Sequence, residues 1–497
     1  MKLSHLIELL GNNLVEVTNL NGKDPEVNDV VSNSRLLKPG NLFICLQGTS
    51  FDSHLLAPEL QERGAAALIA EKKIDVDLDI PIIYVKSSRL AEAHLYMEIN
   101  DHPYKKLTTI GVTGTNGKTT VTTLINHILE TFQRKSALVG TVKNVIGDYV
   151  STNPKNTTPG PATLAKYMKM AVEKNLEYFV MEVSSHGLAM HRVDGMRFDV
   201  AVLTNVTRDH LDFHASFEDY YRTKLRIFNL LKPVGKAVVN SDNVNIGDIK
   251  LPRDKIITYG FGNESDFRME NLEISRTGMY FTVETPFGSK HKVYTRLVGE
   301  HNAYNVTATI ATMESLNYDT EHILEAISTF SGVPGRFEFV EEATKYGFDV
   351  LVDFAHTPDA LEKLLKTAKK LSEGRIIIVF GAGGDADKGK RPLMGEIASR
   401  FADVVILTSD DPKKEDPEEI LNDIEAGISK TKPYLVIPDR REAISVALTL
   451  ANRQDTVLIA GRGHEDYQAF ADYVVAFNDK RVVKEILDTK FRRHAKR

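Results

Sequence analysis

Short runs of β-branched and other apolar residues alternate along the chain with segments in which apolar positions recur at helical spacing. The short runs predict strands and the helical spacing predicts helices. Strands are expected at 107–112, 136–140, 177–183, 199–205, 235–240, 348–353, 375–380, 403–408 and 456–460. Because helical segments fall between several of these strands, we predict an α/β fold with mostly parallel sheets.

The first hundred residues repeat this alternation on a smaller scale. The predicted elements are a strand at 41–46, a helix at 55–64, a strand at 65–70 and a helix at 88–100. The last helix runs into Pro103, and the residue before a proline disfavours helical backbone. We therefore place a domain boundary near residue 104.

A second boundary is expected at 331–336, where Gly332, Pro334 and Gly335 interrupt the pattern. Before it, residues 256–295 form short β-like pieces with glycine turns, which predicts an antiparallel sheet edge. A chain of 497 residues exceeds one hydrophobic core, and about 150 residues per domain favours three domains. Their predicted ranges are 1–104, 105–332 and 333–497.

Composition and charge disfavour several classes of function. Hydrophobic residues make up 42% of the chain, charged residues 26%, and the net charge is -6, so nothing favours nucleic acid or a membrane surface as partner. No run approaches the ~18 apolar residues of a membrane span, and the N-terminus lacks the apolar core of an export signal. The single cysteine, Cys45, excludes an internal disulfide. We expect a cytoplasmic protein that acts as a monomer on small molecules.

The strand predicted at 107–112 ends in a glycine-rich turn that opens directly into a helical pattern. Strand, glycine loop and helix in this order bind phosphates, because backbone N–H groups and the helix N-terminus face the anion. In this short G-x-x-G-K-T form, Lys118 would reach the outer phosphates and the Thr119 hydroxyl would hold Mg²⁺. The residues of this phosphate loop are Gly114, Thr115, Asn116, Gly117, Lys118, Thr119 and Thr120.

A second polar cluster follows the strand predicted at 199–205. It contains Asp209, His210, Asp212 and His214. Residues at the carboxyl end of a strand line the crevice of an open α/β sheet, where ligands bind. Two histidines and two aspartates at this point suit a metal–phosphate site.

A third cluster ends the strand predicted at 177–183. Glu182 is a carboxylate at the end of an apolar strand, where a buried charge needs a partner, and Mg²⁺ with its preference for oxygen ligands is one. Ser184 and His186 would suit a hydrolase nucleophile and base. The G-x-S-x-G turn of such enzymes is absent, which disfavours that alternative.

A fourth motif offers a competing function. Residues 381–386 follow the strand at 375–380 and fit G-x-G-x-x-A, and Asp410 ends the next strand near where a ribose-binding acid would stand. A nicotinamide site is therefore an alternative. The loop also carries several charges, including Asp385 and Arg391, which suits phosphates or an amino acid better than a dinucleotide.

Four segments in this order carry a resemblance to a known family. They are Gly-Thr-Asn-Gly-Lys-Thr-Thr at 114–120, Glu-Val-Ser-Ser-His-Gly-Leu at 182–188, Asp-His-Leu-Asp-Phe-His at 209–214 and Gly-Arg-Gly-His-Glu-Asp-Tyr at 461–467. Together they resemble the Mur ligase family, in its tripeptide-synthetase type, over essentially the whole chain. The resemblance implies a UDP-substrate domain at 1–104, a central ATP-binding domain at 105–332 and a Rossmann-like amino-acid domain at 333–497.

The resemblance also implies a reaction. ATP would phosphorylate the D-glutamate carboxylate of UDP-MurNAc-L-Ala-D-Glu, and the amino group of an added amino acid would attack the acyl phosphate, with ADP and phosphate released. This is a step of peptidoglycan precursor synthesis. Charge in the phosphoryl transfer would be offset by Lys118 and Mg²⁺.

The family pattern assigns roles to individual residues. The expected magnesium ligands are Thr119, Glu182, His210 and Lys224, the last as a CO₂-derived carbamate, although the pattern around Lys224 alone predicts an exposed helix residue. Lys118, His210 and Lys224 are the expected catalytic residues. Further ATP-binding positions would be His301, Asn302, Asn305 and Arg336. The UDP end and the muramoyl peptide would be held by Ser34, Asn156, Thr157, Thr158, Ser184 and Arg192.

The added amino acid is expected to bind at Arg391, Asp410, Asp411, Pro412, Lys413, Gly461 and Glu465. Enzymes of this type that add meso-diaminopimelate typically have Asp-Asn-Pro-Arg where this chain has Asp410-Asp411-Pro412-Lys413. A forked arginine binds the distal carboxylate of diaminopimelate bidentately, whereas an extra carboxylate at Asp411 favours a ligand that ends in an ammonium. We therefore predict L-lysine, with meso-diaminopimelate or ornithine as alternatives, since Lys413 remains a cation.

Two other function classes compete with this prediction. A folylpolyglutamate synthetase-like ligase would share the ATP core, but the UDP-type first domain disfavours it. A non-catalytic nucleotide-gated binding protein would not need Lys118, Glu182, His210 and Lys224 intact.

Overall fold

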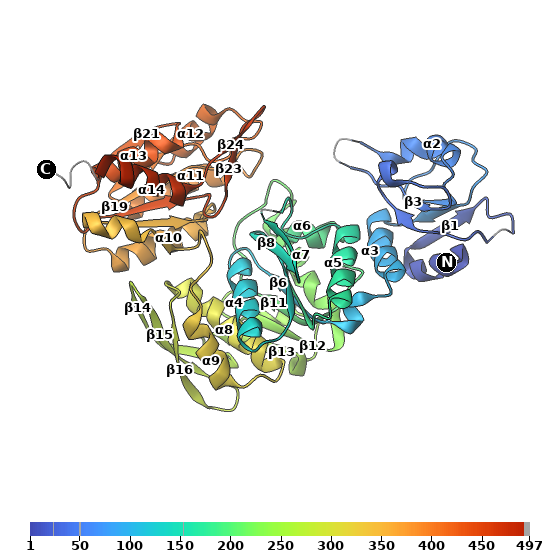
Figure 1. Ribbon diagram of the computed structural model, residues 1–497, viewed down its shortest axis with the longest axis horizontal. Coiled ribbons are helices and arrows are strands. Elements are labelled where there is room, and N and C mark those ends of the chain that lie inside the picture. The colour runs from blue at the N-terminus through green and yellow to red at the C-terminus, as the bar shows by residue number, and fades with distance from the viewer. Residues whose placement is uncertain (23, 49–50, 153, 492–497) are drawn as a thin grey trace. The chain divides into compact units, whose positions relative to one another are not determined.

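The computed structural model describes residues 1–22, 24–48, 51–152 and 154–491. These residues form three large sheets and one two-stranded ribbon (Figure 1). The predicted α/β fold is confirmed. No helix among the described residues is both long and apolar enough to cross a membrane.

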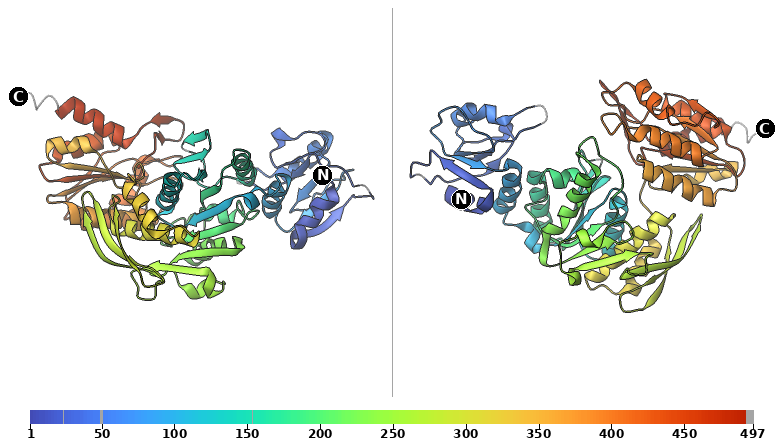
Figure 2. Two further views of the ribbon diagram at one scale, coloured as in Figure 1. Left: turned by 60° about the horizontal axis from the view of Figure 1, so that its bottom comes forward. Right: turned by 180° about the vertical axis from the view of Figure 1, so that it is seen from behind.

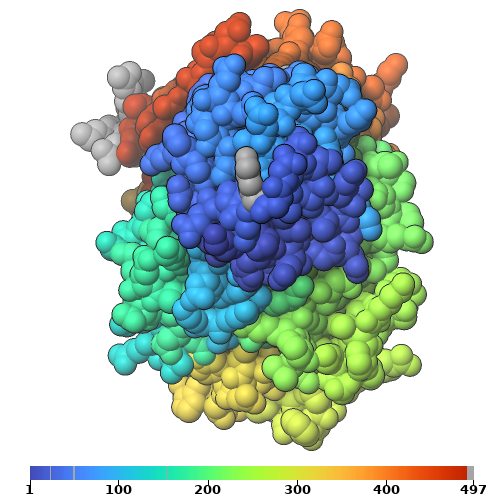
Figure 3. Space-filling model, turned by 90° about the vertical axis from the view of Figure 1, so that its right-hand side faces the viewer, coloured from blue at the N-terminus to red at the C-terminus, as the bar shows by residue number. Residues whose placement is uncertain are grey.

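The N-terminal segment is built on a five-stranded sheet in the order β1-β5-β4-β3-β2. Only the β1–β5 pair is antiparallel. Buried apolar side chains cover both faces of the sheet, and the segment fills the centre of Figure 3 in blue. Its elements are α1 (Leu3–Leu10), β1 (Leu14–Thr18), β2 (Val30–Val31), β3 (Leu42–Ile44), α2 (Ala57–Glu62), β4 (Ala67–Ala70), β5 (Ile82–Val85) and α3 (Ser88–Ile99).

The central segment contains an eleven-stranded sheet in the order β16-β15-β14-β13-β12-β11-β6-β10-β7-β8-β9. Strands β6, β10 and β7 pair in parallel, and so do β12, β13 and β14. The elements of its first half are β6 (Thr108–Thr113), α4 (Lys118–Thr131), β7 (Ser136–Val139), β8 (Lys143–Ile146), β9 (Tyr149–Thr152), α5 (Pro161–Glu173), β10 (Tyr178–Glu182), α6 (Ser185–Ala189) and β11 (Phe198–Leu203).

The second half of this segment carries the antiparallel part of the sheet. The antiparallel edge predicted at 256–295 is present from β14 to β16, while β13 pairs in parallel on both sides. The predicted strand at 235–240 begins earlier, at Leu231. The elements are α7 (Phe217–Leu225), β12 (Leu231–Asn240), β13 (Ile256–Gly260), β14 (Phe267–Ser275), β15 (Gly278–Glu284), β16 (Lys290–Thr295), α8 (Glu300–Ser315) and α9 (Thr320–Thr329).

The C-terminal segment is a six-stranded sheet in the order β17-β18-β22-β19-β20-β21, parallel except for β17. Apolar side chains of α10, α11 and α12 pack on one face and those of α13 and α14 on the other. Figure 2 shows these helices on the two sides of the sheet. The elements are β17 (Glu338–Phe339), β18 (Asp349–Asp353), α10 (Pro358–Leu371), β19 (Ile376–Phe380), α11 (Lys390–Phe401), β20 (Val404–Leu407), α12 (Pro417–Glu425), β21 (Tyr434–Val436), α13 (Arg440–Leu450), β22 (Thr456–Ala460), β23 (Tyr467–Ala469), β24 (Val474–Ala476) and α14 (Asp479–Ile486).

The chain packs as two compact units. The first comprises Met1–Thr113, Gln133–Ala201 and Thr223–Lys236, and the second comprises Gly114–Phe132, Val202–Arg222 and Ala237–Arg497. The phosphate loop therefore belongs to the second unit, and Glu182 and Lys224 belong to the first. The domain boundaries expected at residues 104 and 332 stay predictions.

Candidate active site

The phosphate loop lies between β6 and α4, as the sequence pattern predicts. Its two glycines adopt backbone angles that other residues rarely adopt, with φ of 148° at Gly114 and 88° at Gly117. A Cβ at Gly114 would lie 1.8 Å from Thr204 Oγ1, and one at Gly117 would lie 2.3 Å from Asn305 Oδ1. Both positions thus require glycine for conformation and for space.

The loop is fastened to the segment that follows β11. The Thr115 N–H donates to the Asn205 carbonyl oxygen at 2.8 Å, and the Asn116 N–H donates to Asn205 Oδ1 at 3.0 Å. The Lys118 ammonium donates to the carbonyl oxygens of Gly114 and Thr115 at 2.8 and 2.9 Å. The cation is therefore held against the loop at the N-terminus of α4, where an anion is stabilised by the helix dipole.

The predicted nucleotide residues gather around one cavity of the second unit. Its lining includes Asn116, Gly117, Thr120, His301, Asn302, Asn305 and Arg336. Asn305 Nδ2 donates to Asn302 Oδ1 at 2.9 Å, which fixes both amides. Burial lowers the pKa of His301 to about 4, so this ring is neutral at neutral pH. Asp353, which the sequence pattern did not single out, lines the same cavity.

The polar cluster after β11 is also ordered. His210 adopts a positive φ of 54°, and its Nε2 lies 3.4 Å from Asp209 Oδ2. Burial alone would raise the pKa of Asp209, but the neighbouring His210, His356 and Lys390 side chains and the His210 N–H outweigh this effect and lower it. The Tyr220 hydroxyl lies 3.0 Å from Thr115 Oγ1. The phosphate loop and the 209–214 cluster therefore share a polar neighbourhood within the second unit.

The first unit brings together Glu182 and the residues expected to hold the muramoyl peptide. Glu182 is buried, and its two carboxylate oxygens accept from the Thr141 N–H at 2.8 Å and the Thr141 hydroxyl at 3.0 Å. Thr141 Oγ1 lies 3.1 Å from Thr157 Oγ1. This places one of the predicted peptide residues a single side chain away from the predicted metal ligand.

Thr158 connects the remaining residues of this group. Its hydroxyl accepts from the Ser184 N–H at 2.8 Å, and its carbonyl oxygen accepts from Arg192 at 2.9 Å. Ser184 Oγ accepts from the Gly187 N–H at 3.0 Å and so caps α6. This capping role accounts for Ser184 without a hydrolase mechanism.

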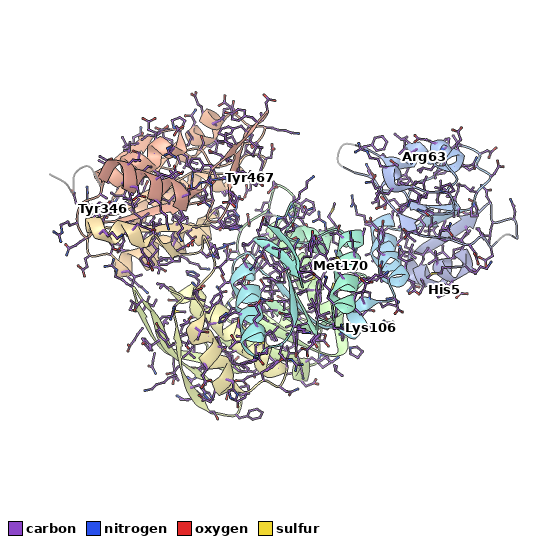
Figure 4. All side chains as sticks on the ribbon, in the orientation of Figure 1. His5, Arg63, Lys106, Met170, Tyr346 and Tyr467 are labelled. Atoms are coloured by element: carbon purple, nitrogen blue, oxygen red, sulfur yellow. The ribbon has the colours of Figure 1, made fainter. Side chains whose placement is uncertain are left out.

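Three further predicted residues of the first unit are placed separately. Ser34 lies in a short turn where its carbonyl oxygen accepts from Arg63 at 2.6 Å, a residue labelled in Figure 4. Asn156 is exposed in the loop before α5. Lys224 lies on α7 and is 1% exposed, so the exposed position that the local pattern predicts for it is wrong.

The predicted amino-acid residues lie at the carboxyl ends of β19, β20 and β22. Arg391 is buried and donates to both oxygens of Glu415 at 3.0 Å and to Asp423 at 2.9 Å. The Arg391 contact lowers the pKa of Glu415 to about 2. The guanidinium of Arg391 is thus already engaged by two carboxylates of this chain.

A buried charge cluster stands beside it. Arg462 contacts Asp410 and Asp411 and lies 3.3 Å from Glu465 Oε2. One carboxylate oxygen from each of these three acids lies within 4.8 Å of the other two. Asp411 Oδ1 also accepts from the Ala469 N–H at 2.8 Å. The sequence predicted that the Asp411 carboxylate binds the ammonium end of the added amino acid. In the structure this carboxylate is engaged by Arg462 and by the backbone, which removes the main support for lysine.

The acidity of Glu465 gives a testable prediction. Burial raises the pKa of Glu465 to about 8, and the nearby Asp410 and Asp411 carboxylates act in the same direction, against the opposing effect of Arg462 and Arg440. Between about pH 5 and about pH 8 the folded chain keeps a proton that the unfolded chain has released, so the stability contributed by this group falls as pH rises. Thermal unfolding of a Glu465→Gln variant should show a weaker decline in melting temperature over this range.

The exposed Glu396 on α11 supplies the matched control for that measurement. Glu396→Gln removes one carboxylate from the surface and should follow the wild-type dependence on pH. Parallel curves for wild type and Glu465→Gln would mean that Glu465 ionises normally in the folded chain.

The glycines of the Gly381 loop are required by packing within the chain. A Cβ at Gly381 would lie 2.1 Å from the Thr408 carbonyl oxygen, and one at Gly384 would lie 1.9 Å from that of Pro412. These glycines let the loop pack against the segment after β20, instead of opening space for a pyrophosphate. The nicotinamide alternative finds no support in this geometry.

Two models of known protein families match this chain. Residues 112–313 match the Mur ligase middle domain, and residues 335–463 match the Mur ligase, glutamate ligase domain. The chain belongs to the Mur ligase family and is an acid–amino-acid ligase of peptidoglycan synthesis.

Similar proteins include ligases named for diaminopimelate. The UDP-N-acetylmuramoyl-L-alanyl-D-glutamate--2,6-diaminopimelate ligase of Caldanaerobacter subterraneus subsp. tengcongensis is 41% identical over 93% of this chain and 95% of its own length. The ligase of the same name from Geobacillus kaustophilus is 42% identical over 93% and 95%. A solved structure of a ligase of this name is 31% identical, with a TM-score of 0.66 over 94% of this chain and 95% of its own.

Proposed function

We propose that this chain adds 2,6-diaminopimelate, in an ATP-dependent reaction, to the D-glutamyl carboxylate of UDP-N-acetylmuramoyl-L-alanyl-D-glutamate. The observation that carries the proposal is the identity of about two fifths, over nearly the whole chain, to ligases named for diaminopimelate. The lysine prediction has no such support, and diaminopimelate, its first alternative, fits better.

The local geometry is compatible with a dicarboxylic amino acid. Asp411 is held by Arg462 and Ala469, as described, so it is not available to repel a distal carboxylate. Lys413 is exposed, and its backbone N–H donates to the Ala469 carbonyl oxygen at 3.1 Å. Its side chain forms no ion pair within the described part of the chain. We propose that Lys413 pairs with the distal carboxylate and that a carboxyl oxygen of Glu465 accepts from the distal ammonium.

The chemistry we propose proceeds through an acyl phosphate. The D-glutamyl carboxylate attacks the γ-phosphorus of ATP, the bond to the β–γ bridging oxygen breaks, and ADP leaves. The amino group of diaminopimelate then attacks the acyl carbon, phosphate leaves, and the ammonium proton is lost. Lys118 and the phosphate-loop N–H groups would offset the charge on the transferring phosphoryl group.

We propose that Mg²⁺ is held by Thr119, Glu182, His210 and a carbamate on Lys224. The donor set suits this ion because it supplies mainly oxygen ligands. Glu182 fits such a role, since it is a carboxylate buried at the end of β10, and Thr141 donates to each of its oxygens. When bound, Mg²⁺ would supply positive charge to the phosphates.

The test is ADP release with ATP, Mg²⁺ and UDP-MurNAc-L-Ala-D-Glu against meso-diaminopimelate, L-lysine and L-ornithine. Turnover with diaminopimelate should exceed that with lysine by about a hundredfold or more. Lysine has no distal carboxylate, so Lys413 would be left without its proposed partner, and an unpaired charged contact is costly. Turnover with lysine alone would instead restore the lysine prediction.

The distal carboxylate contact has its own test in Lys413→Ala. This variant should raise the KM for diaminopimelate about tenfold through loss of one charge-assisted contact. The neighbouring exposed Lys414 gives the matched control, and Lys414→Ala should leave the KM unchanged. Equal effects of the two substitutions would remove Lys413 from the binding site.

A further inference from the structure

A fully buried ion pair lies beside the proposed amino-acid site in the C-terminal sheet. It joins Arg440, the first residue of α13, to Asp479, the first residue of α14, and these two helices pack on the same face of the sheet (Figure 1). Arg440 Nε donates to Asp479 Oδ1 at 2.8 Å, and Nη2 donates to Oδ2 at 2.8 Å. Both side chains are 0% exposed. The sequence pattern singled out neither residue.

The guanidinium of Arg440 also reaches the backbone at two strand ends. Nη2 donates to the Ala460 carbonyl oxygen at 3.0 Å, and Nη1 donates to the Ser409 carbonyl oxygen at 3.4 Å. Ala460 ends β22 and leads into residues 461–465, the β22 loop. Ser409 follows β20 and leads into residues 410–413, the β20 loop. One side chain therefore binds the peptide group that enters each of the two loops that carry proposed amino-acid residues.

These two loops leave strands that are not neighbours in the sheet. Strand β19 lies between β20 and β22 and pairs with both. The loops still approach each other closely, because a Cβ at Gly461 would lie 2.2 Å from Asp410 Oδ2. Contacts other than the strand ladder must therefore set their spacing. Arg440 supplies such contacts as a planar fork with donors in fixed directions.

Stability alone does not account for this pair. Burial of two charges carries a large desolvation cost, and apolar side chains of similar volume are often as stable as a buried ion pair or more so. Arg440 also stands at the first position of α13, where the helix dipole favours an anion over a cation. A role that needs the geometry of the guanidinium explains why a cation is kept at this buried position.

We propose that Arg440 is a positioning residue for the amino-acid site, and that it sets the spacing of the β20 loop and the β22 loop by binding the carbonyl oxygen at the start of each. The inference rests on the proposed function, in which Lys413 of one loop and Glu465 of the other bind the distal end of the amino acid. Arg440 itself does not touch the substrate in this role. A change in the spacing would misplace Lys413 relative to Glu465, so the KM for the amino acid is the quantity that should respond.

The test replaces both partners with apolar side chains in Arg440→Met/Asp479→Leu, which leaves no unpaired charge in the core. The KM for the amino acid that the wild type uses should rise about tenfold, the scale of one lost charge-assisted contact. The KM for ATP should stay unchanged, since neither residue is among those that line the nucleotide cavity. The control Arg441→Met/Glu485→Leu removes an exposed pair, 2.8 Å apart, between the same two helices and should change neither KM.

Hydrogen exchange of the full chain without substrates gives a second readout that does not need turnover. Peptides of the β20 loop and the β22 loop should exchange about tenfold faster in Arg440→Met/Asp479→Leu, because local opening of the loops becomes easier. Peptides of β19, which lies between them, should exchange as in wild type. A residue that only stabilised the fold would instead speed exchange throughout the sheet.

Two results would overturn the inference. Wild-type KM values and wild-type exchange of both loops in Arg440→Met/Asp479→Leu would show that the pair does not set their spacing. Faster exchange across the whole C-terminal sheet, with equal rises in the KM for ATP and for the amino acid, would assign the pair to the stability of the fold. Use of lysine by the wild type would contradict the proposed function alone, because the same comparison of KM values would then be made with lysine.

Discussion

Replacement of Lys118 by alanine is expected to lower the rate of ADP formation by about a thousandfold, which is the upper range for loss of one preorganised donor in phosphoryl transfer. The ammonium is held over the phosphate loop by the carbonyl oxygens of Gly114 and Thr115. It is therefore positioned before any phosphate arrives, and a transferring phosphoryl group would lose its nearest fixed cation in the variant. Coupled detection of ADP with the complete substrate set measures the effect.

The fold should tolerate this substitution. The loop stays fastened by the Thr115 and Asn116 contacts to Asn205, which do not involve the lysine side chain. The melting temperature should thus stay within a few degrees of wild type. Lys169→Ala, at an exposed position on α5, is the control for a lost surface charge. Near-normal turnover of Lys118→Ala would contradict the assignment of the phosphate loop.

The phosphate loop could be predicted from the sequence because its chemistry is local. Strand, glycines, lysine and helix follow one another within a dozen residues, and each glycine is required by its own backbone angle. The same holds for the alternation of strands and helices, which gave the fold class. Short edge strands such as β2 and β17 were missed, since two residues carry no periodicity.

The residues of the proposed amino-acid site could be named from the sequence, but their contacts with one another could not be predicted. Asp411 and Arg462 are about fifty residues apart in the chain, and only the fold shows that they form an ion pair. Reading Asp411 as a free carboxylate led to lysine. The contacts of Glu415 and Asp423 with Arg391 were missed for the same reason, because a charged residue in a turn or on a helix predicts only a solvated position.

Lys224 shows where the pattern misleads outright. On α7 it stands among Tyr220, Arg222 and other polar residues, and this polar spacing is typical of an exposed helix face. The structure buries it, at 1% exposure. A buried lysine is rare unless it is paired or has a function, so burial is an observation that supports its proposed role independently of the family pattern.

Replacement of Lys224 by alanine is expected to lower turnover about a hundredfold or more, comparable to loss of one electrostatic contact to the transferring phosphoryl group. In the proposed modification the lysine ammonium first releases a proton, and the free amine then attacks CO₂. A nitrogen–carbon bond forms, one carbon–oxygen π bond of CO₂ breaks and a second proton is released, so that a cation is replaced by an anion. Short carboxylates such as formate or acetate should restore part of the activity of Lys224→Ala, because they can enter the space left by the side chain and offer the missing oxygens.

The variant Lys224→Met distinguishes the proposed carbamate from a role of the side chain in packing alone. It keeps the length of the side chain in its buried position but cannot form a carbamate, so it should be inactive and should not respond to formate or acetate. A readout independent of activity is the carbon-13 NMR spectrum in labelled bicarbonate. A carbamate resonance should be present in wild type and absent from both variants. Full activity of Lys224→Met would remove the carbamate from the mechanism and leave the buried lysine with a packing role.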